Sequence, residues 1–129
     1  MPQQVEMLLR LLLAGGLGAL IGYQRERSHK PAGLRTHSLI CVGAAMFTVA
    51  GELAFNGDSR LAAGVVTGIG FLGAGAILHR HASVEGLTTA ATMWVVAAIG
   101  LAVGGGLYIV GPGAALVTFI ILSLPHPTQ

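Results

Sequence analysis

Formal charge is scarce in this sequence. Asp, Glu, Lys and Arg together make up 9% of its 129 residues, whereas charged residues are about a quarter of a typical soluble domain. Hydrophobic residues make up 53%, so too few polar side chains are present to cover a water-facing surface. The composition excludes an ordinary soluble globule and a disordered chain, and it predicts an integral membrane protein.

Cysteine is almost absent, because Cys41 is the only one. A single thiol excludes a disulfide framework within the chain and a structural zinc site built from several thiolates. Basic residues are also few, since seven Lys and Arg against five Asp and Glu leave a formal net charge of +2. Cations scattered between apolar segments form no stripe that follows a phosphate backbone, so nucleic acid is not an expected partner.

Stretches without charge predict the membrane spans. No stretch alternates polar with apolar residues, which favours helices over a barrel. Gly86 to Leu124 holds 39 residues without formal charge, enough for two crossings of a core about 30 Å thick. We expect a break at Gly104–Gly106 and a kink at Gly111-Pro112-Gly113. The five expected spans form one all-α membrane domain over 5–124, at about 5–23, 34–55, 61–78, 87–104 and 107–124.

Basic residues gather in the first and third loops of this arrangement. Arg25, Arg27, Lys30 and Arg35 lie in or next to the first loop, and Arg80 lies in the third. Short cytoplasmic loops are enriched in Lys and Arg, so both loops are predicted to face the cytoplasm. The N-terminus is then outside the cell and the C-terminus is cytoplasmic.

Glycine is frequent, with 20 residues, many of them inside the predicted spans. Frames of two small residues four positions apart let helices approach closely where lipid supplies no hydrophobic driving force. We expect these frames to pack inside the bundle, although one of them forming a contact between copies is an alternative. The frames are Gly18/Gly22, Gly64/Gly68 and Gly100/Gly104.

A dense glycine run containing Gly68, Gly70, Gly73 and Gly75 crosses the third predicted span. Its first six residues match the dinucleotide fingerprint, but that fingerprint requires a turn between a strand and a helix. The match is therefore rejected, and the run is expected either to pack tightly or to line a cavity. Trp94 lies well inside the fourth span and is expected to pack between helices.

The segment from Arg25 to His37 is the richest in candidate functional residues. Glu26 and Lys30 share one face if the first helix continues beyond the membrane until Pro31. Arg35 and His37 fall at the start of the second span, where the helix dipole disfavours cations. We therefore expect a compensating anion from Glu26, a lipid phosphate or a ligand; the alternative is a simple cytoplasmic anchor.

Hydroxyl groups at the start of the fourth span extend this region. A helix N-terminus with hydroxyls beside arginines suits an anion, although such threonines also commonly bond to carbonyls of their own helix or to a neighbouring helix. Together the segment and the hydroxyls form a predicted cytoplasmic polar cluster of Arg25, Glu26, Lys30, Arg35, Thr36, His37, Thr88 and Thr89.

Carboxylates near the outer face are the remaining candidates. Glu52 and Asp58 are weak candidates for a magnesium site, because such sites often use one or two carboxylates plus waters; solvated loop charges are the simpler interpretation. Glu6 and Arg10, one helical turn apart, are expected to form an ion pair. We expect no cofactor.

Four motifs, in this order, resemble the MgtC/SapB family of bacterial inner-membrane proteins, over Leu12 to Leu122. They are Gly18-Ala-Leu-Ile-Gly22-Tyr-Gln-Arg-Glu26-Arg, Lys30-Pro-Ala-Gly-Leu-Arg-Thr-His37, Gly68-Ile-Gly-Phe-Leu-Gly-Ala-Gly75 and Gly86-Leu-Thr-Thr-Ala-Ala91, with Trp94 following. The resemblance implies a five-span inner-membrane protein linked to magnesium limitation, and in pathogens to virulence and survival inside macrophages.

The same resemblance implies more about function. Family members are labelled magnesium-transport proteins, some are considered to bind and restrain the F-type ATP synthase, and relatives are associated with acid resistance. Many carry a cytoplasmic C-terminal domain with an ACT-like fold. Such a soluble domain is not expected in this chain, which stops at Gln129.

A regulator that binds another membrane complex, such as the F-type ATP synthase, is the predicted function. Ion conductors usually hold an ionisable residue in mid-span, and none is present between Leu11 and Gly22 or in the third, fourth and fifth spans. The alternative is a small oligomeric transporter or channel for magnesium or another small ion, with backbone carbonyls along its path. An enzyme is not expected, and the expected partners are the lipid bilayer, a second copy in a dimer, and a membrane complex.

Overall fold

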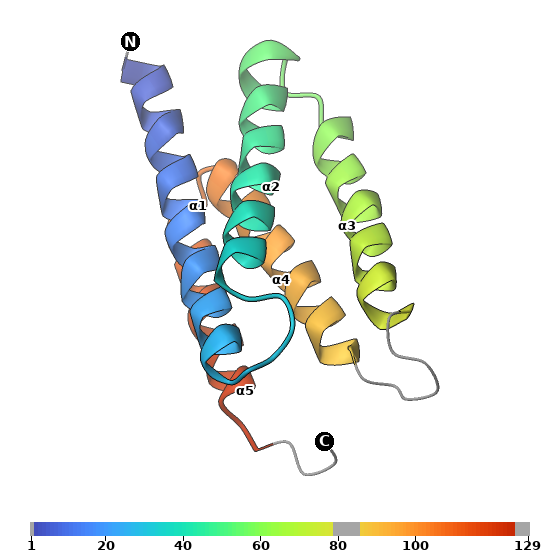
Figure 1. The fold of residues 1–129 in the computed structure, drawn as a ribbon. Coiled ribbons are helices and arrows are strands. Elements are labelled where there is room, and N and C mark those ends of the chain that lie inside the picture. The colour runs from blue at the N-terminus through green and yellow to red at the C-terminus, as the bar shows by residue number, and fades with distance from the viewer. Residues whose placement is uncertain (1, 79–85, 126–129) are drawn as a thin grey trace.

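Five α-helices make up the computed structural model, which describes residues 2–78 and 86–125. The described residues include no strand, which confirms the all-α prediction. Successive helices run in opposite directions, so the start of α1 and the end of α5 lie at opposite ends of the bundle (Figure 1). The helices are α1 (Pro2–Arg27), α2 (Leu34–Ala54), α3 (Arg60–Leu78), α4 (Leu87–Gly104) and α5 (Val110–Leu122).

Helices α1 to α4 are long and apolar enough to cross a membrane, but α5 is not. It has 13 residues and therefore rises about 20 Å, less than a hydrocarbon core of about 30 Å. The expected start at residue 107 is wrong, because α5 begins at Val110. Pro112 then lies in the first helical turn, where its missing N–H breaks no bond of the helix. The Gly-Pro-Gly segment therefore starts α5 and does not kink a longer span.

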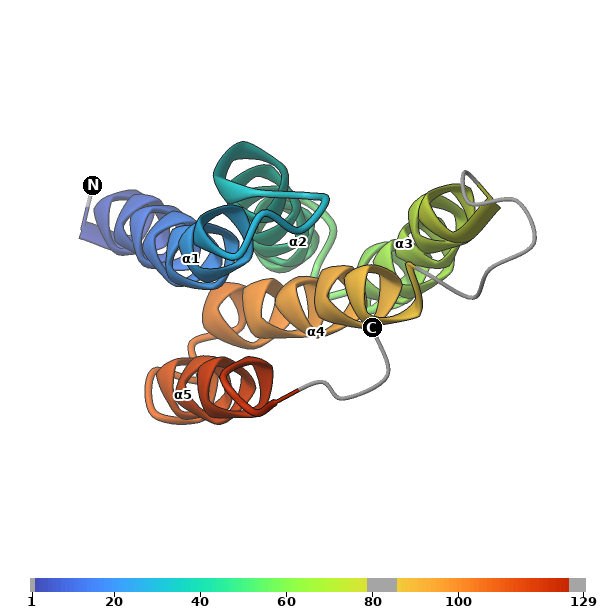
Figure 2. The same ribbon diagram turned by 60° about the horizontal axis from the view of Figure 1, so that its bottom comes forward.

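Helix α4 occupies the centre of the bundle. Figure 2 shows α1 and α2 on one side of it, α5 on the other, and α3 beside its first half. Each of these four helices contacts α4. Half of the apolar window of α4 is buried, against 11% for α3. The apolar core accordingly forms around α4, where Val96, Ile99 and Val103 pack with Ile21 and Cys41.

Glycines of α1 and α4 lie directly against the backbone of α2. A Cβ atom on Gly18 would lie 2.6 Å from the carbonyl oxygen of His37, and one on Gly22 would lie 2.7 Å from that of Gly33. A Cβ atom on Gly104 would lie 2.7 Å from the carbonyl oxygen of Ala45. These distances leave no room for a side chain, so both helices approach α2 backbone to backbone.

The glycines of α3 have different surroundings. No heavy atom of the described residues outside α3 lies within 4 Å of a Cβ position on Gly64, Gly68 or Gly75. A Cβ on Gly73 would lie 3.3 Å from the Ala90 side chain. Among the glycines of the run that begins at Gly68, Gly70 and Gly73 are the ones that approach described residues of α4, and Ile69 beside Gly70 packs with Met93 and Ala97 of α4.

Trp94 is the α4 side chain that faces Gly70, at 3.7 Å from a Cβ position there. Its side chain remains 49% exposed, so the ring lies only partly between the helices.

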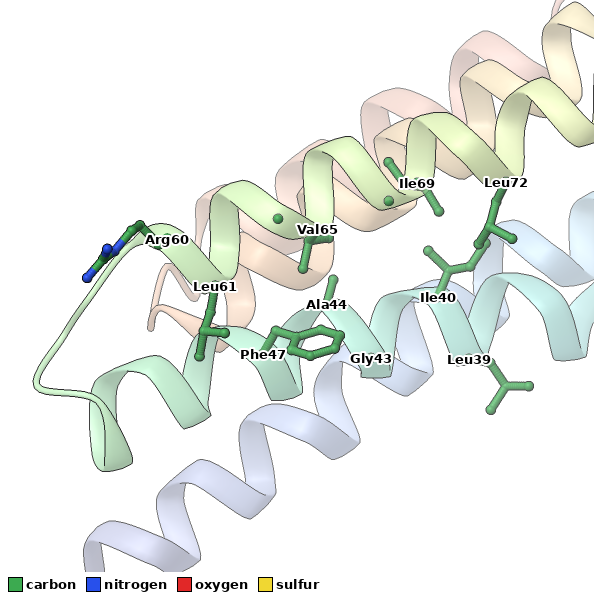
Figure 3. Close-up of a pocket in the computed structure, with 12 residues that line it drawn as sticks. Leu39, Ile40, Gly43, Ala44, Phe47, Arg60, Leu61, Val65, Ile69 and Leu72 are labelled. Atoms are coloured by element: carbon green, nitrogen blue, oxygen red, sulfur yellow. The ribbon is translucent and has the colours of Figure 1, made fainter.

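An apolar groove separates α2 from α3 (Figure 3) and encloses about 480 Å³. Ile40, Phe47 and Leu72 are among the side chains that line it, and Arg60 lies at one end. The unpartnered glycines Gly64 and Gly68 also line this groove. Of the two interpretations of the glycine run, Gly68 thus fits the cavity wall rather than tight packing.

Arg10 connects three parts of the bundle at the end where α1 starts. Its Nε donates to Tyr108 Oη at 2.8 Å, its Nη1 to the Gly104 carbonyl oxygen at 2.9 Å, and its Nη2 to Glu6 Oε2 at 2.8 Å. The expected ion pair of Glu6 with Arg10 is therefore confirmed. The guanidinium also supplies a donor to the last carbonyl of α4, which lacks one within its own helix. The turn after α4, where a break was expected, is thus fixed to α1.

Alanine in place of Gly18 is expected to destabilise the bundle by about 1–3 kcal/mol, because its methyl group would overlap the α2 backbone. Alanine in place of Gly68 meets open space and is expected to stabilise α3 by up to about 1 kcal/mol. Cys41 is fully buried, so the temperature at which a thiol-reactive fluorophore labels it in detergent reports unfolding. Equal labelling temperatures for the two variants would contradict the packing described here.

Tyr108→Phe is expected to cost about 1 kcal/mol, because it removes an acceptor from Arg10 and a donor to Glu6. Tyr23→Phe serves as the matched control, since Tyr23 is 55% exposed and its hydroxyl has no hydrogen bond to another described residue. The same Cys41 labelling assay measures both variants. A control variant as unstable as Tyr108→Phe would show that the network contributes nothing measurable.

Candidate functional site

The residues of the predicted polar cluster separate into a buried and an exposed group. Arg25, His37 and Thr89 are buried in the bundle and lie together. Thr88 is half-buried at the start of α4. The remaining members are exposed, and within the described residues their side chains form no hydrogen bond to the side chains of the buried three; they are Glu26, Lys30, Arg35 and Thr36.

Arg25 lies in the last turn of α1 and is 3% exposed. Its Nη2 donates to Thr89 Oγ1 on α4 and to the Pro31 carbonyl oxygen, 3.2 Å away, in the connection between α1 and α2. Its Nε is buried without an acceptor. No carboxylate of the described residues forms an ion pair with Arg25. The arrangement therefore offers donors and positive charge, which suit an anion and not a metal ion.

His37 joins α2 to α4 and has no exposed surface. Its Nδ1 lies 3.1 Å from the Gly33 carbonyl oxygen, which can only accept, so Nδ1 carries a proton. Its Nε2 lies 3.1 Å from Thr92 Oγ1, and that hydroxyl lies 2.8 Å from the Thr89 carbonyl oxygen. The single hydroxyl proton of Thr92 can serve only one of these two acceptors, so its position is coupled to the charge of the ring.

Thr92 belongs to this group but is absent from the predicted cluster. The signal for it was present, because Thr89 and Thr92 are three residues apart and share a helix face. Thr88 and Thr92 are four residues apart and also share a helix face, next to the face of Thr89. Sequence alone does not say which of these faces meets α1 and α2. The structure selects the face of Thr89.

Glu26, one of the anions considered for the start of α2, lies at the first turn of that helix. Its Oε1 accepts a hydrogen bond from the Leu34 backbone N–H at 3.1 Å, so the carboxylate lies at the positive end of the α2 dipole. The expected pairing of Glu26 with Lys30 along a continued helix is wrong, because α1 ends at Arg27.

A Schellman motif ends α1. The Lys30 N–H bonds to the Arg25 carbonyl oxygen and the His29 N–H to that of Glu26, and His29 has a φ of 57°. The helix thus stops three residues before Pro31 is reached, and Lys30 leaves the helix surface. The expectation that Pro31 itself ends the helix is corrected accordingly.

The two weak metal candidates each lie beside an arginine. Asp58 Oδ2 is 2.8 Å from Arg60 Nη2, and this contact holds the pKa of Asp58 below its usual value. Glu52 Oε1 is 3.7 Å from Arg10 Nη1. Within residues 2–78 and 86–125, no three His, Cys, Asp or Glu side chains are grouped so as to hold a metal ion.

Comparisons with known proteins identify the family. The model of the MgtC family matches residues 11–129. The "Putative magnesium transporter YhiD" of Escherichia coli (strain K12) is 43% identical over 131 residues, covering 94% of this chain and 61% of that protein. "Protein MgtC" of Brucella abortus (strain 2308) is 50% identical over 114 residues, covering 84% of this chain and 47% of that protein.

"Protein SrpB" of Synechococcus elongatus is 43% identical over 130 residues, covering 88% of this chain and 71% of that protein. No solved structure matches the chain. The chain spans between about half and three fifths of the length of the Brucella and Escherichia coli relatives. The family model covers nearly all of the sequence. The expected resemblance is therefore confirmed, and the chain belongs to the MgtC family.

Proposed function

We propose that this chain is the membrane domain of a regulator that acts when magnesium is limiting, by binding another membrane complex such as the F-type ATP synthase. The family and the printed name of the Escherichia coli relative support the link to magnesium. The proposed location is the bacterial inner membrane, and the proposed domain covers residues 5–124.

The charge of the bundle interior is the observation that favours a regulatory function and argues against magnesium transport. The charged side chains buried among the described residues are Arg10 and Arg25, one near each end of α1. A path for a divalent cation through this interior would pass the charge of Arg25, which no carboxylate of the described residues compensates, and Coulomb repulsion is strong in a medium of low dielectric constant. The carboxylates Glu6 and Glu52 lie at one end only, where both contact Arg10.

The exposed glycines that α3 contributes to the groove beside α2 support a partner within the membrane. Exposed apolar side chains such as Phe71 are expected on any helix that faces lipid. The frame of Gly64 and Gly68 is different, because it costs helix stability and serves no contact inside the bundle. Small residues at this spacing favour close packing of a second helix. We propose that a helix of the partner complex packs there, with a second copy of this chain in a dimer as the alternative.

The charge distribution supports the proposed orientation. At the end of the bundle where α1 stops and α2 starts, the described residues carry four cations and one carboxylate. The opposite end carries three carboxylates and two cations. By the positive-inside rule, the first of these ends faces the cytoplasm.

Purified protein in liposomes loaded with a magnesium-sensitive dye is expected to give no magnesium flux above protein-free liposomes. In the same study, a membrane complex is expected to co-purify with the chain from native membranes after crosslinking, and mass spectrometry identifies its subunits. Magnesium flux that depends on the protein would overturn the proposal in favour of transport.

Gly68→Leu provides the matched test of the α3 surface, because its side chain enters open space and leaves the fold intact. Co-purification of the partner is expected to fall at least about tenfold, as expected when a bulky side chain enters a close helix contact. Gly16→Leu is the control, since Gly16 is likewise exposed and unpartnered but lies on α1. Equal co-purification with both variants would show that α3 is not the contact surface.

A further inference from the structure

We infer that the end of α1 and the start of α4 form a binding site for a phosphate group, with Arg25 as its principal donor. The inference concerns a ligand of this chain, goes beyond the proposed regulatory role and does not depend on it. It rests on two independent observations, namely the unsatisfied donors of Arg25 and the uncapped first turn of α4.

Arg25 has more donors than the described residues satisfy. Nη2 donates to both of the acceptors that Arg25 contacts, while Nε is buried without an acceptor within the described ranges. Arg25 is almost fully buried, because only 3% of the residue's surface is exposed. A buried guanidinium without an anionic partner is costly, because the interior does not replace the hydration that the charge has lost. An anion that accepts from the free N–H groups removes that cost.

The first turn of α4 contains Thr89, which Arg25 contacts, and its first N–H groups have no acceptor among the described residues. Its N-cap is Gly86, which has a φ of 99° that L side chains rarely adopt, so a capping serine or aspartate is not accommodated. The first turn contains no acidic residue. Its first internal bond runs from the Ala90 N–H to the Gly86 carbonyl oxygen, so the N–H groups of residues 87–89 precede the helical ladder. Thr89, which Arg25 contacts, is the third residue of this turn.

The start of α2 shows the contrast within the same end of the bundle. There the Leu34 N–H is satisfied by the carboxylate of Glu26. Glu26 is the one carboxylate among the described residues at this end, and it accepts a hydrogen bond from the first turn of α2. Arg25 and α4 therefore share a positive charge and a helix dipole without an acidic side chain of their own in the described ranges.

The chemistry of these donors selects a tetrahedral oxyanion. Guanidinium N–H groups, backbone N–H groups at a helix N-terminus and threonine hydroxyls are together the usual ligands of phosphate. Thr88 is half-buried in the same turn and is a second threonine at the start of α4. The site lies at one end of the bundle, so the phosphate group belongs either to a phospholipid headgroup or to a free phosphate ion.

Purified protein in detergent, stripped of phospholipid and free of phosphate, tests the inference through the labelling temperature of the buried Cys41. One titration uses inorganic phosphate, a second uses phosphatidylglycerol, and a phosphate-free glycolipid is the reference for the second. We expect a saturable rise in the labelling temperature with one of the two phosphate sources. Arg25→Gln is expected to weaken that binding at least about tenfold, because charge-assisted hydrogen bonds are lost.

Arg27→Gln is the matched control, because it removes the same charge from an exposed position on the same helix. A rise with inorganic phosphate assigns a free ion, and a rise with phosphatidylglycerol alone assigns a headgroup. No rise in the wild-type protein, or equal rises in wild type and Arg25→Gln, overturns the inference.

Two further measurements cover the remaining outcomes. If Arg25→Gln fails to fold, equilibrium dialysis of the wild-type protein with labelled phosphate and with labelled phosphatidylglycerol must still show saturable uptake of one of them. Glu85 directly precedes Gly86 in the sequence. A response that appears only in Glu85→Gln would show that a carboxylate of the chain fills the site, and would also overturn the inference.

Discussion

Contact between the glycines of α1 and α4 and the backbone of α2 is the constraint on which the other features depend. Gly18 and Gly22 bring α1 onto α2, and Gly104 brings the end of α4 onto the same helix from another side. Three helix backbones then lie closer together than side chains of ordinary size would allow. Only at this separation does the Arg25 side chain of α1 reach Thr89 on α4, and only then does His37 reach Thr92.

The two buried arginines, Arg10 and Arg25, differ in how their positive charge is compensated. Arg10 finds acceptors on Glu6, Tyr108 and the last carbonyl of α4, so its charge is compensated within the chain. Arg25 finds neutral oxygens only. Among the described residues, the buried cation at one end of the bundle has carboxylate partners, and the buried cation at the other end has none. This difference distinguishes a structural arginine from one available to a ligand.

Local features of the sequence were predictable because they depend on neighbours along the chain. Charge spacing located α2, α3 and α4 within about one residue of their observed ends, and the one-turn separation of Glu6 and Arg10 gave their ion pair. The end of α1 was missed, since nothing short of backbone geometry shows that His29 adopts a positive φ.

Features that depend on which helix faces meet were not predictable. Arg25 and Arg35 look alike in sequence, yet the first is buried and the second exposed. The rotation of α1 and α2 about their axes decides this, and the close glycine contacts set that rotation. The same reason explains why Thr92 was omitted and why Gly68 lines a groove while Gly73 contacts α4.

The short length of α5 has a consequence for the surrounding lipid. Four helices fit a bilayer of ordinary thickness, while α5 spans about two thirds of it. Gln24 donates a hydrogen bond to the Leu122 carbonyl oxygen at 3.1 Å, which fixes the end of α5 to α1 and prevents it from sliding to a better depth. Acyl chains beside α5 must therefore shorten or tilt, at a cost of fractions of a kcal/mol per Å of hydrophobic mismatch. We therefore expect a bilayer around the bundle to be thinner along the flank of α5 than beside the four longer helices.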